Sequence, residues 1–411
     1  MTIWLLALLL MASTAALGYR QGAIRVAVSF IGIIVGTLLA LPLAKLVKIL
    51  LGSFGVVNPV VLWILGPVIA FVIISAIFKA CALPLHQKID VHYKYHAGDL
   101  RLALWERLNS RLGLCLGLLN GAAYTILICF GIYILSYWTF QVGSGDQDPR
   151  GMRILNRLGE DLQKTGFNKV ARTLDSLPDS YYKVADLVGL IYFNPLLEAR
   201  MSQYPPFLSL AERTDFSTIG KDKEFTQMRM RKEPIMGLLK YQSVDPMIQN
   251  PETVKLVWNT IHENLADLPG YLDTGKSAKY DSQKILGRWR FDVSAAAAAA
   301  RRARPNMPSS EMLKLRRWMQ LAFADTTIVA MTDGKITLKN LPTVRQPAAT
   351  PAQPGAPVTV SSETLQGKWK DLDDKYQINF DGKDDIFAKI EGSRLMMNFE
   401  GTTLAFVPQG Y

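Results

Sequence analysis

The chain has 411 residues, 49% of them hydrophobic, which is enough for two or three units of ordinary domain size. Its 46 Lys and Arg exceed its 35 Asp and Glu, and the net charge of +11 suits anionic lipid headgroups or another polyanion. All three cysteines, Cys81, Cys115 and Cys129, precede residue 130, so no disulfide framework can hold the rest of the chain, and no CxxC-type metal site occurs.

The long apolar runs are concentrated in the first 140 residues. Four of them can approach or cross a hydrocarbon core of about 30 Å: Ile3–Leu17, Ala23–Ala44, Pro59–Leu83 and Leu112–Trp138. The start of the chain could also be a signal peptide, because small residues follow its apolar stretch. No Lys or Arg precedes Arg20, however, so we predict an uncleaved first helix. A four-helix membrane domain over residues 1–140 also favours lipid over nucleic acid as the polyanion.

The cations near these runs predict an orientation. The connection between the first and second runs carries Arg20 and Arg25. The connection between the third and fourth runs carries Lys88, Lys94, Arg101, Arg107 and Arg111, with Lys79 just before it. The opposite side has only Lys45 and Lys48 close to membrane ends. The positive-inside rule places the basic side in the cytoplasm. We therefore expect a multi-pass protein of the bacterial inner (plasma) membrane with both termini outside the cytoplasm.

The connection Pro84–Arg111 is longer than a turn. Leu100, Leu104 and Leu108 share one helical face, which predicts a short helix lying at the membrane interface. The basic turn residues Arg20 and Arg25 and the basic side chains of this helix would then reach anionic headgroups. The basic residues of the helix are Arg101, Arg107 and Arg111.

Glycines recur at four-residue intervals in two of the apolar runs. They are Gly32 and Gly36 in the second run and Gly113, Gly117 and Gly121 in the fourth. This spacing clears one helix face so that a neighbouring backbone can approach closely. No Asp, Glu, Lys or Arg lies in the middle of a run, so the pattern favours a tightly packed bundle over an ion path.

Three features of residues 1–140 are distinctive: the order of the spans, the segment from Gly18 to Arg25, and the segment from Leu108 to Gly113 that leads into the later glycines. In these features the chain resembles the colicin V production protein family. Gln21 departs from the family's pattern, which tends to have a basic residue at that position. The resemblance implies an inner-membrane protein involved in export, toxin production or envelope homeostasis. Some relatives carry a protease domain after the fourth helix, outside the cytoplasm.

The remainder divides into a linker and a soluble α+β module. Residues 141–149 are a polar linker, and residues 150–280 favour short helices, one of which begins at Pro251. Residues 281–343 form a first α+β unit, whose insertion Ala295–Phe323 favours helix. Residues 344–361 are a Pro/Ala-rich linker, and residues 362–411 form a C-terminal antiparallel β-meander.

The two strand-rich stretches begin alike. Trp289 and Trp369 each follow a glycine and a basic residue, and both are predicted to lie in a β core. Xaa-Gly pairs such as Asp333-Gly334 and Asp381-Gly382 predict hairpins. The Gly-x-Trp opening also resembles the first strand of lipocalin-like β-units. Because the second stretch supplies about five strands, we expect the two stretches to pack together or onto the helical region.

Catalytic patterns are scarce in the module. His262 is its only histidine, and it lies on a predicted amphipathic helix where a structural role is the simpler interpretation. No Gly-x-Ser-x-Gly turn, P-loop, dinucleotide fingerprint or HExxH motif occurs. His92 and His96 have helical spacing, but no third metal ligand follows in order. We therefore expect no enzyme, no cofactor and no metal site.

Two functions remain open from the sequence. The first is a membrane-anchored scaffold whose extracytoplasmic module binds an envelope protein or a cell-wall polymer. The second is a ligand-binding or transport-accessory protein that uses a lipocalin-like β-unit. A filled β core would favour the first, whereas an open apolar cavity, which needs a closed barrel of about eight strands, would favour the second. The sequence does not indicate the oligomeric state.

Overall fold

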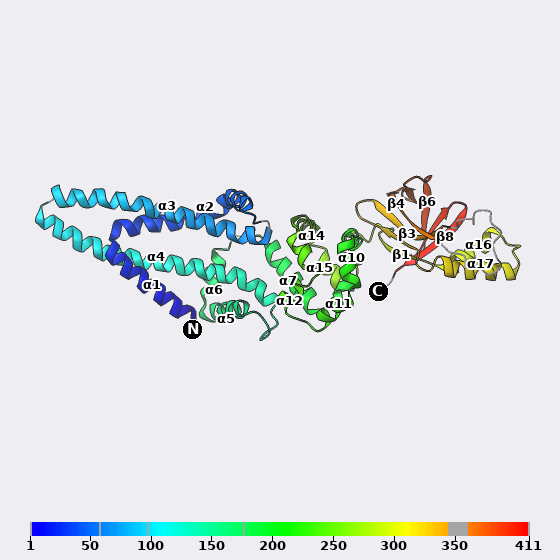
Figure 1. Ribbon diagram of the computed structural model, residues 1–411, viewed down its shortest axis with the longest axis horizontal. Coiled ribbons are helices and arrows are strands. Elements are labelled where there is room, and N and C mark those ends of the chain that lie inside the picture. Colours follow the sequence, from blue (N-terminus) through cyan, green and yellow to red (C-terminus); the bar gives the residue numbers. More distant parts are fainter. Residues whose placement is uncertain (1, 57–58, 97, 176, 344–360, 410–411) are drawn as a thin grey trace. The chain divides into compact units, whose positions relative to one another are not determined.

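The computed structural model describes residues 2–56, 59–96, 98–175, 177–343 and 361–409 (Figure 1). The linker predicted over residues 344–361 lies outside the described residues except for its last position. The chain divides into two compact units: Met1–Phe193 with Asp222–Trp258, and Asn194–Lys221 with Asn259–Tyr411. Each unit is described separately below.

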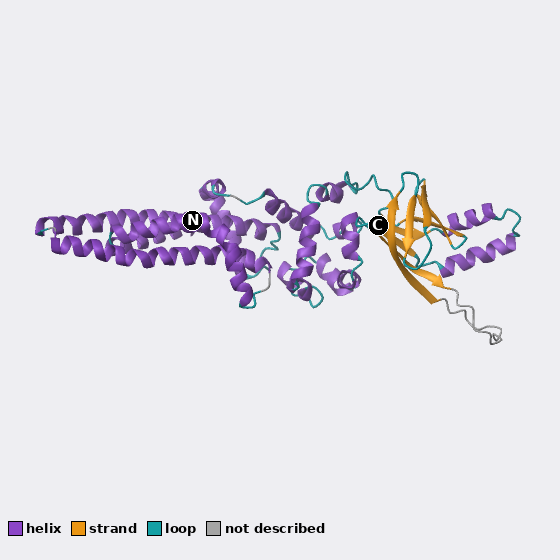
Figure 2. Ribbon diagram, turned by 90° about the horizontal axis from the view of Figure 1, so that it is seen from above, coloured by secondary structure: helices purple, strands orange, loops and turns teal. Residues whose placement is uncertain are grey.

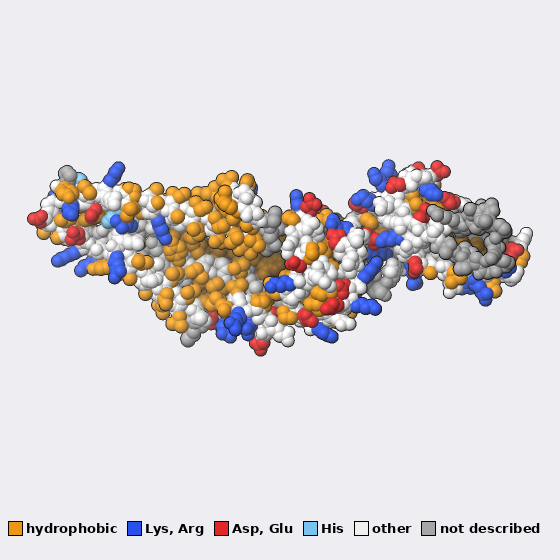
Figure 3. Space-filling view, in the orientation of Figure 1, with side chains coloured by type: hydrophobic (Ala, Val, Ile, Leu, Met, Phe, Trp, Pro, Cys, Tyr) orange, Lys and Arg blue, Asp and Glu red, His pale blue; other side chains and the backbone are white. Residues whose placement is uncertain are grey.

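The first unit begins with four long helices, as the apolar runs predict. They are α1 (Thr2–Gln21), α2 (Ala23–Ser53), α3 (Pro59–His96) and α4 (Asp99–Gln141). All four are long and apolar enough to cross a membrane. Figure 3 shows apolar side chains gathered over the surface of this part of the chain. These features indicate a multi-pass membrane protein, because apolar side chains facing outward need an apolar solvent.

The structure corrects the prediction of a separate interfacial helix. The segment predicted as a separate helix is the first part of α4, which begins at Asp99 and runs without a break, and α3 extends to His96. At 38 and 43 residues, α3 and α4 are about 57 and 65 Å long at 1.5 Å per residue, roughly twice the hydrocarbon thickness. The physical reason lies in the sequence. No glycine or proline lies between Asp99 and Leu112 to end a helix, and the turn is made at Gly98, with φ of 75°.

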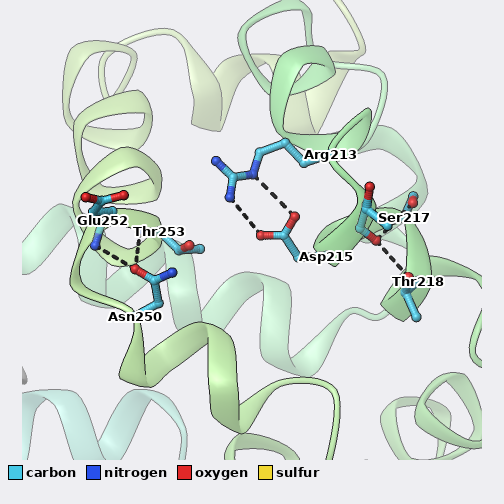
Figure 4. A network of polar contacts seen from close by, with 8 residues as sticks. Arg213, Asp215, Ser217, Thr218, Asn250, Glu252 and Thr253 are labelled. Atoms are coloured by element: carbon cyan, nitrogen blue, oxygen red, sulfur yellow. Dashed lines mark hydrogen bonds and ion pairs between the residues drawn. The ribbon is translucent and has the colours of Figure 1, made fainter.

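Short helices complete the first unit. They are α5 (Arg150–Thr165), α6 (Phe167–Thr173), α7 (Asp179–Phe193), α11 (Lys223–Met230), α12 (Ile235–Leu239), α13 (Asp245–Gln249) and α14 (Pro251–Glu263), of which the last continues into the second unit. Leu162 of α5 is buried against Ile3 of α1 and Cys129 and Ile132 of α4. The predicted helix start at Pro251 is confirmed, and the Asn250 side chain accepts hydrogen bonds from the first-turn amides there (Figure 4).

The second unit opens with α8 (Leu197–Met201), a 3₁₀ turn (Pro205–Phe207), α9 (Leu208–Ala211), α10 (Thr214–Lys221) and α15 (Leu268–Thr274). An ion pair between Arg213 and Asp215, 2.8 Å from Nη2 to Oδ2, lies at the start of α10 (Figure 4). Leu208 of α9 is fully buried against Val329 and Met331. The helices of this unit therefore pack directly onto its strands.

Eight antiparallel strands form a closed barrel in chain order (Figure 2). They are β1 (Gly287–Phe291), β2 (Thr327–Ala330), β3 (Lys335–Thr343), β4 (Ser361–Asp371), β5 (Tyr376–Phe380), β6 (Ile386–Glu391), β7 (Arg394–Phe399) and β8 (Thr402–Pro408). The predicted hairpins are present. Gly334 and Gly382 turn with φ of 77° and 76°, a backbone conformation that glycine adopts without strain.

Barrel closure changes the interpretation of the meander. The sequence stretch 362–411 supplies five strands, β4–β8, too few for a closed barrel, and the structure adds β1–β3 to them. The seam is the pairing of β1 with β8, where Phe291 lies opposite Phe406. On the other side, Lys335 of β3 pairs with Lys368 of β4. Residues 281–343 and 362–411 thus share one hydrogen-bonded barrel with no free edge.

The predicted helical insertion is confirmed as a helical hairpin between β1 and β2. It consists of α16 (Val293–Ala303) and α17 (Ser309–Ala322). Asp292 caps α16 by accepting hydrogen bonds from the amides of Ser294 and Ala295. Ala296 and Met319 belong to the barrel core, and Phe323 stacks on Phe291 with ring centroids 4.6 Å apart. One side of the hairpin is therefore anchored in the barrel.

Candidate functional sites

The glycines of α4 face the backbone of α1. A Cβ placed on Gly113 would collide with the Gly18 carbonyl oxygen, and one on Gly117 would lie 2.9 Å from the Cα of Ala15. A Cβ on Gly121 would lie 2.7 Å from the Cα of Met11. All three glycines are buried. The two helices thus approach along a stripe where a larger side chain has no room.

The turn between α1 and α2 is held by α4. Gly22 has φ of 81°, and the Asn109 side chain lies directly against it. Asn109 Oδ1 accepts a hydrogen bond from the Ala23 amide at 2.7 Å. The segments 18–25 and 108–113 therefore contact each other, because the turn at Gly22 lies against the start of the glycine stripe.

The glycines of α2 accept aromatic rings from α3. A Cβ on Gly32 would lie 2.6 Å from the Cβ of Phe78, and one on Gly36 would lie 3.0 Å from the ring of Phe71. Gly32 and Gly36 are both buried. Here the glycines make space for large side chains, whereas those of α4 make space for a backbone.

The predicted basic residues have unlike surroundings. Arg20, Arg101, Arg107 and Arg111 are exposed. Arg25 is half-buried and lines a cavity of about 310 Å³ between α1, α2, α3 and α4. The exposed leucines Leu100, Leu104 and Leu108 lie along the same part of α4 as three of these arginines. The structure therefore separates Arg25 from the surface cations with which the sequence groups it.

Trp289 and Trp369 both lie in the barrel core. They are 4% and 9% exposed, and each indole N–H donates to a backbone carbonyl, of Ile285 at 2.8 Å and of Met331 at 3.0 Å. A buried indole needs such a partner, because an unmatched buried donor is costly. The matching sequence positions thus have matching environments.

Large side chains fill the interior of the barrel. Among the most buried are Ile328, Leu338, Ile378, Phe380, Leu395, Met397 and Phe406. Tyr376 packs against this cluster and is partly buried. A separate recess of about 270 Å³ lies beside it, lined by residues that include Trp289, Tyr280 and Ile390. An eight-stranded barrel is narrow enough for its own side chains to fill it, and this one does.

A basic surface on the α16–α17 hairpin was not predicted. Six cations lie between residues 293 and 323 against the single acid Glu311, and all six are exposed: Arg301, Arg302, Arg304, Lys314, Arg316 and Arg317. Within the described parts of the chain, no salt bridge engages them. Leu313, Trp318 and Leu321 are exposed on the same α17. The excess of cations over acids was the signal available in the sequence.

A polar cluster joins the helices next to the barrel. Tyr204, fully buried, donates its hydroxyl to Asp267 at 2.8 Å, and Ser277 donates to the same carboxylate oxygen at 2.5 Å. Burial and the bond to Asp267 raise the pKa of Tyr204. Burial also raises the pKa of Asp267, but the hydrogen bonds from Ser277, Tyr204 and the backbone outweigh it, so this pKa lies below its ordinary value.

A second half-buried carboxylate lies beside the barrel. Glu212, which follows α9, pairs with Arg288 of β1 at 3.1 Å and with Lys339 of β3. With two cations on one carboxylate, the geometry is that of a structural clamp between helix and barrel rather than of a catalytic group. Among the described residues, no group of three or more His, Cys, Asp or Glu side chains is arranged to hold a metal ion.

Comparisons with protein-family models, with curated proteins and with solved structures found no match to this chain.

Proposed function

We propose that this chain is a membrane-anchored envelope scaffold of the colicin V production type, whose barrel module binds a partner protein outside the cytoplasm. In this proposal the four helices anchor the chain in a bacterial inner membrane, and the module serves export, toxin production or envelope homeostasis without catalysing a reaction. The observation that carries the proposal is the filled interior of the barrel. A barrel whose interior holds these buried side chains would recognise another molecule through its outer surface.

The surface of the α16–α17 hairpin is the best candidate for the contact. Its six cations and its exposed Leu313, Trp318 and Leu321 combine charge with apolar area, and aromatic and arginine side chains are typical of binding hot spots. The hairpin is fixed to the barrel by Met319 and Phe323, so it is a rigid surface. Its positive charge favours a partner with an acidic surface.

Crosslinking from the hairpin tests this proposal. A photoreactive residue at Leu321, which is 83% exposed, in the full chain in native membranes should capture one discrete envelope protein. Arg316→Glu with Arg317→Glu should lower the capture at least tenfold, because it reverses the local charge. Lys370→Glu with Lys389→Glu, exposed on strands of the same barrel, is the matched control and should leave the capture unchanged.

Two outcomes would contradict the proposal. Capture that is equally strong after both charge reversals would remove the hairpin from the contact. Capture of a cell-wall polymer in place of a protein would replace the partner class.

The second candidate, a ligand carrier, rests on the eight-stranded closed barrel itself, which is the architecture such proteins need. The fully buried Phe380, Phe406 and Leu338 inside this barrel argue against it. A spin-labelled fatty acid that bound the full chain in detergent stoichiometrically, with quenching of Trp369, would favour this candidate.

The orientation has its own test. Because the cations flank one side of the bundle, we expect the C-terminus to lie outside the cytoplasm. A reporter that is active only in the cytoplasm, fused after Tyr411, should stay silent, and a periplasm-active reporter at the same site should give signal. Activity of the cytoplasmic reporter would reverse the topology.

A further inference from the structure

A half-open cavity of about 310 Å³ lies among the four long helices, and all four helices line it. α1 contributes Thr14 and Gln21, α2 contributes Arg25 and Ser29, α3 contributes Lys79, and α4 contributes Asn120 and Tyr124. It lies at the end of the bundle where the turn between α1 and α2 rests on α4. Polar side chains from all four helices thus surround a hollow among otherwise apolar helices.

The lining of this cavity is positively charged. Arg25 and Lys79 both line it, and none of its lining residues is Asp or Glu. Arg25 Nε is buried and has no hydrogen-bond partner among the described residues. A buried N–H without a partner destabilises the fold, and an acceptor in the cavity would remove that cost. A guanidinium and an amine that line one cavity suit the oxygens of a phosphate group.

The cavity also offers an acceptor. Asn120 is 7% exposed; its Nδ2 donates to the Val26 carbonyl at 3.3 Å, and its Oδ1 has no partner among the described residues. A fully ionised anion could not use that oxygen. An anion that also carries a hydroxyl would satisfy both the orphan donor of Arg25 and the orphan acceptor of Asn120.

The edge of the cavity is apolar. Leu17 and Leu83 line it, and both have about half of their side-chain surface exposed. In a bundle that spans a membrane, such exposed leucines face acyl chains. A cationic interior with an apolar edge fits an amphiphile whose phosphate enters the cavity while its chains stay in the bilayer.

We propose that this cavity is a binding site for a phosphate group that carries a hydroxyl, supplied by a lipid headgroup such as that of phosphatidylglycerol. The phosphate oxygens accept from Arg25 and Lys79, and a headgroup hydroxyl donates to Asn120 Oδ1. Free hydrogenphosphate has the same chemistry and is the other source. The inference is independent of the partner proposed for the barrel module.

Native mass spectrometry of the full chain, released from nanodiscs of phosphatidylglycerol mixed with phosphatidylcholine, tests the site. The wild type should retain phosphatidylglycerol in preference to phosphatidylcholine. Arg25→Gln with Lys79→Gln should lower the retained phosphatidylglycerol at least tenfold. The matched control is Lys45→Gln with Lys94→Gln, which removes one exposed cation from each of the same two helices, α2 and α3, and should keep the lipid.

A second measurement separates the two sources and guards against unfolding. Thermal melting of the delipidated protein should show that the cavity variant is as stable as the control variant when no lipid is present, because the substitutions leave the glycine contacts intact. Inorganic phosphate that raises the melting temperature of the wild type, but not of the cavity variant, would assign the site to free phosphate. Equal lipid retention by the cavity and control variants, or no preference of the wild type for phosphatidylglycerol, would overturn the proposal.

Discussion

The helical bundle and the barrel bury their interiors in opposite ways. Along the contact of α1 with α4, Gly113, Gly117 and Gly121 remove side chains so that backbone meets backbone. In the barrel, Trp289, Trp369 and a set of phenylalanines and leucines fill the space between strands. The first contact is built from the smallest residue, and the second from the largest.

The difference follows from the solvent. A barrel in water gains about 25 cal/mol for every Å² of apolar surface that it buries, so large side chains stabilise it most. Helices in a bilayer gain nothing by exchanging lipid for an equally apolar neighbour, so close approach and dispersion must hold them together. The same chain therefore needs bulk in one region and its absence in the other.

Removing bulk from the barrel should have the largest effect. Trp369→Ala deletes a 9% exposed indole and its hydrogen bond to the Met331 carbonyl, and such truncations cost about 3–5 kcal/mol. Because β1–β8 close on one another, all eight strands should unfold together and not only β4–β8. Limited proteolysis of the full chain in detergent should then cleave between residues 284 and 409 while the four helices remain protected.

Trp318→Ala is the control for this prediction, since Trp318 is 42% exposed on α17. We expect it to leave the proteolysis pattern unchanged. A Trp369→Ala protein that keeps its barrel resistant would show that Trp369 is not needed to fill the core.

Adding bulk to the bundle should have the next largest effect. Gly117→Leu places a side chain where the Thr14 carbonyl and the Ala15 Cα already lie, so the helices must separate or shift. Overpacking typically costs about 1–3 kcal/mol, and here the obstacle is backbone, which yields less than a side chain. Leu118→Ile, on an outward face of the same helix, is the volume-matched control. Melting curves in detergent should shift for the first variant alone, and equal curves would remove the glycine stripe from the packing.

Much of this architecture follows from local sequence. The four apolar runs, the helix start at Pro251 and the turns at Gly334 and Gly382 depend on residues that are neighbours in the chain, and the structure has them all. The length of α4 also follows from local sequence, because no glycine or proline between Asp99 and Leu112 ends the helix. The amphipathic spacing of Leu100, Leu104 and Leu108 is compatible with a separate short helix, but the absence of a helix-breaking residue decides against one.

Closure of the barrel could not be predicted from residues that are neighbours in the sequence. Phe291 pairs with Phe406 across more than a hundred residues that include two helices, and no property of either residue indicates the other. The cavity at Arg25 is equally non-local, because it forms only where four helices meet. The sequence places Arg25 with the exposed cations on charge alone, whereas its environment in the structure depends on Asn120 and Lys79 from other helices.

The smallest effect on stability is expected from the polar cluster of Tyr204, Asp267 and Ser277 beside the barrel, and this effect depends on pH. The pKa of Asp267 is lowered in the folded chain, so its hydrogen bonds stabilise the fold fully above the ordinary carboxyl pKa of about 4. That contribution is lost as the pH falls through the lowered pKa. Asp267→Asn should cost about 1–2 kcal/mol at neutral pH and flatten the acid dependence of barrel unfolding, because hydrogen bonds to a charged partner are stronger than those to an amide.

Asp273→Asn, exposed on α15, is the control and should leave both the stability and its acid dependence unchanged. The glycine contacts of the bundle involve no ionised group, so Asp267→Asn should leave the melting of the bundle unchanged. Identical acid profiles for the Asp267 variant and the wild type would show that the cluster does not stabilise the second unit.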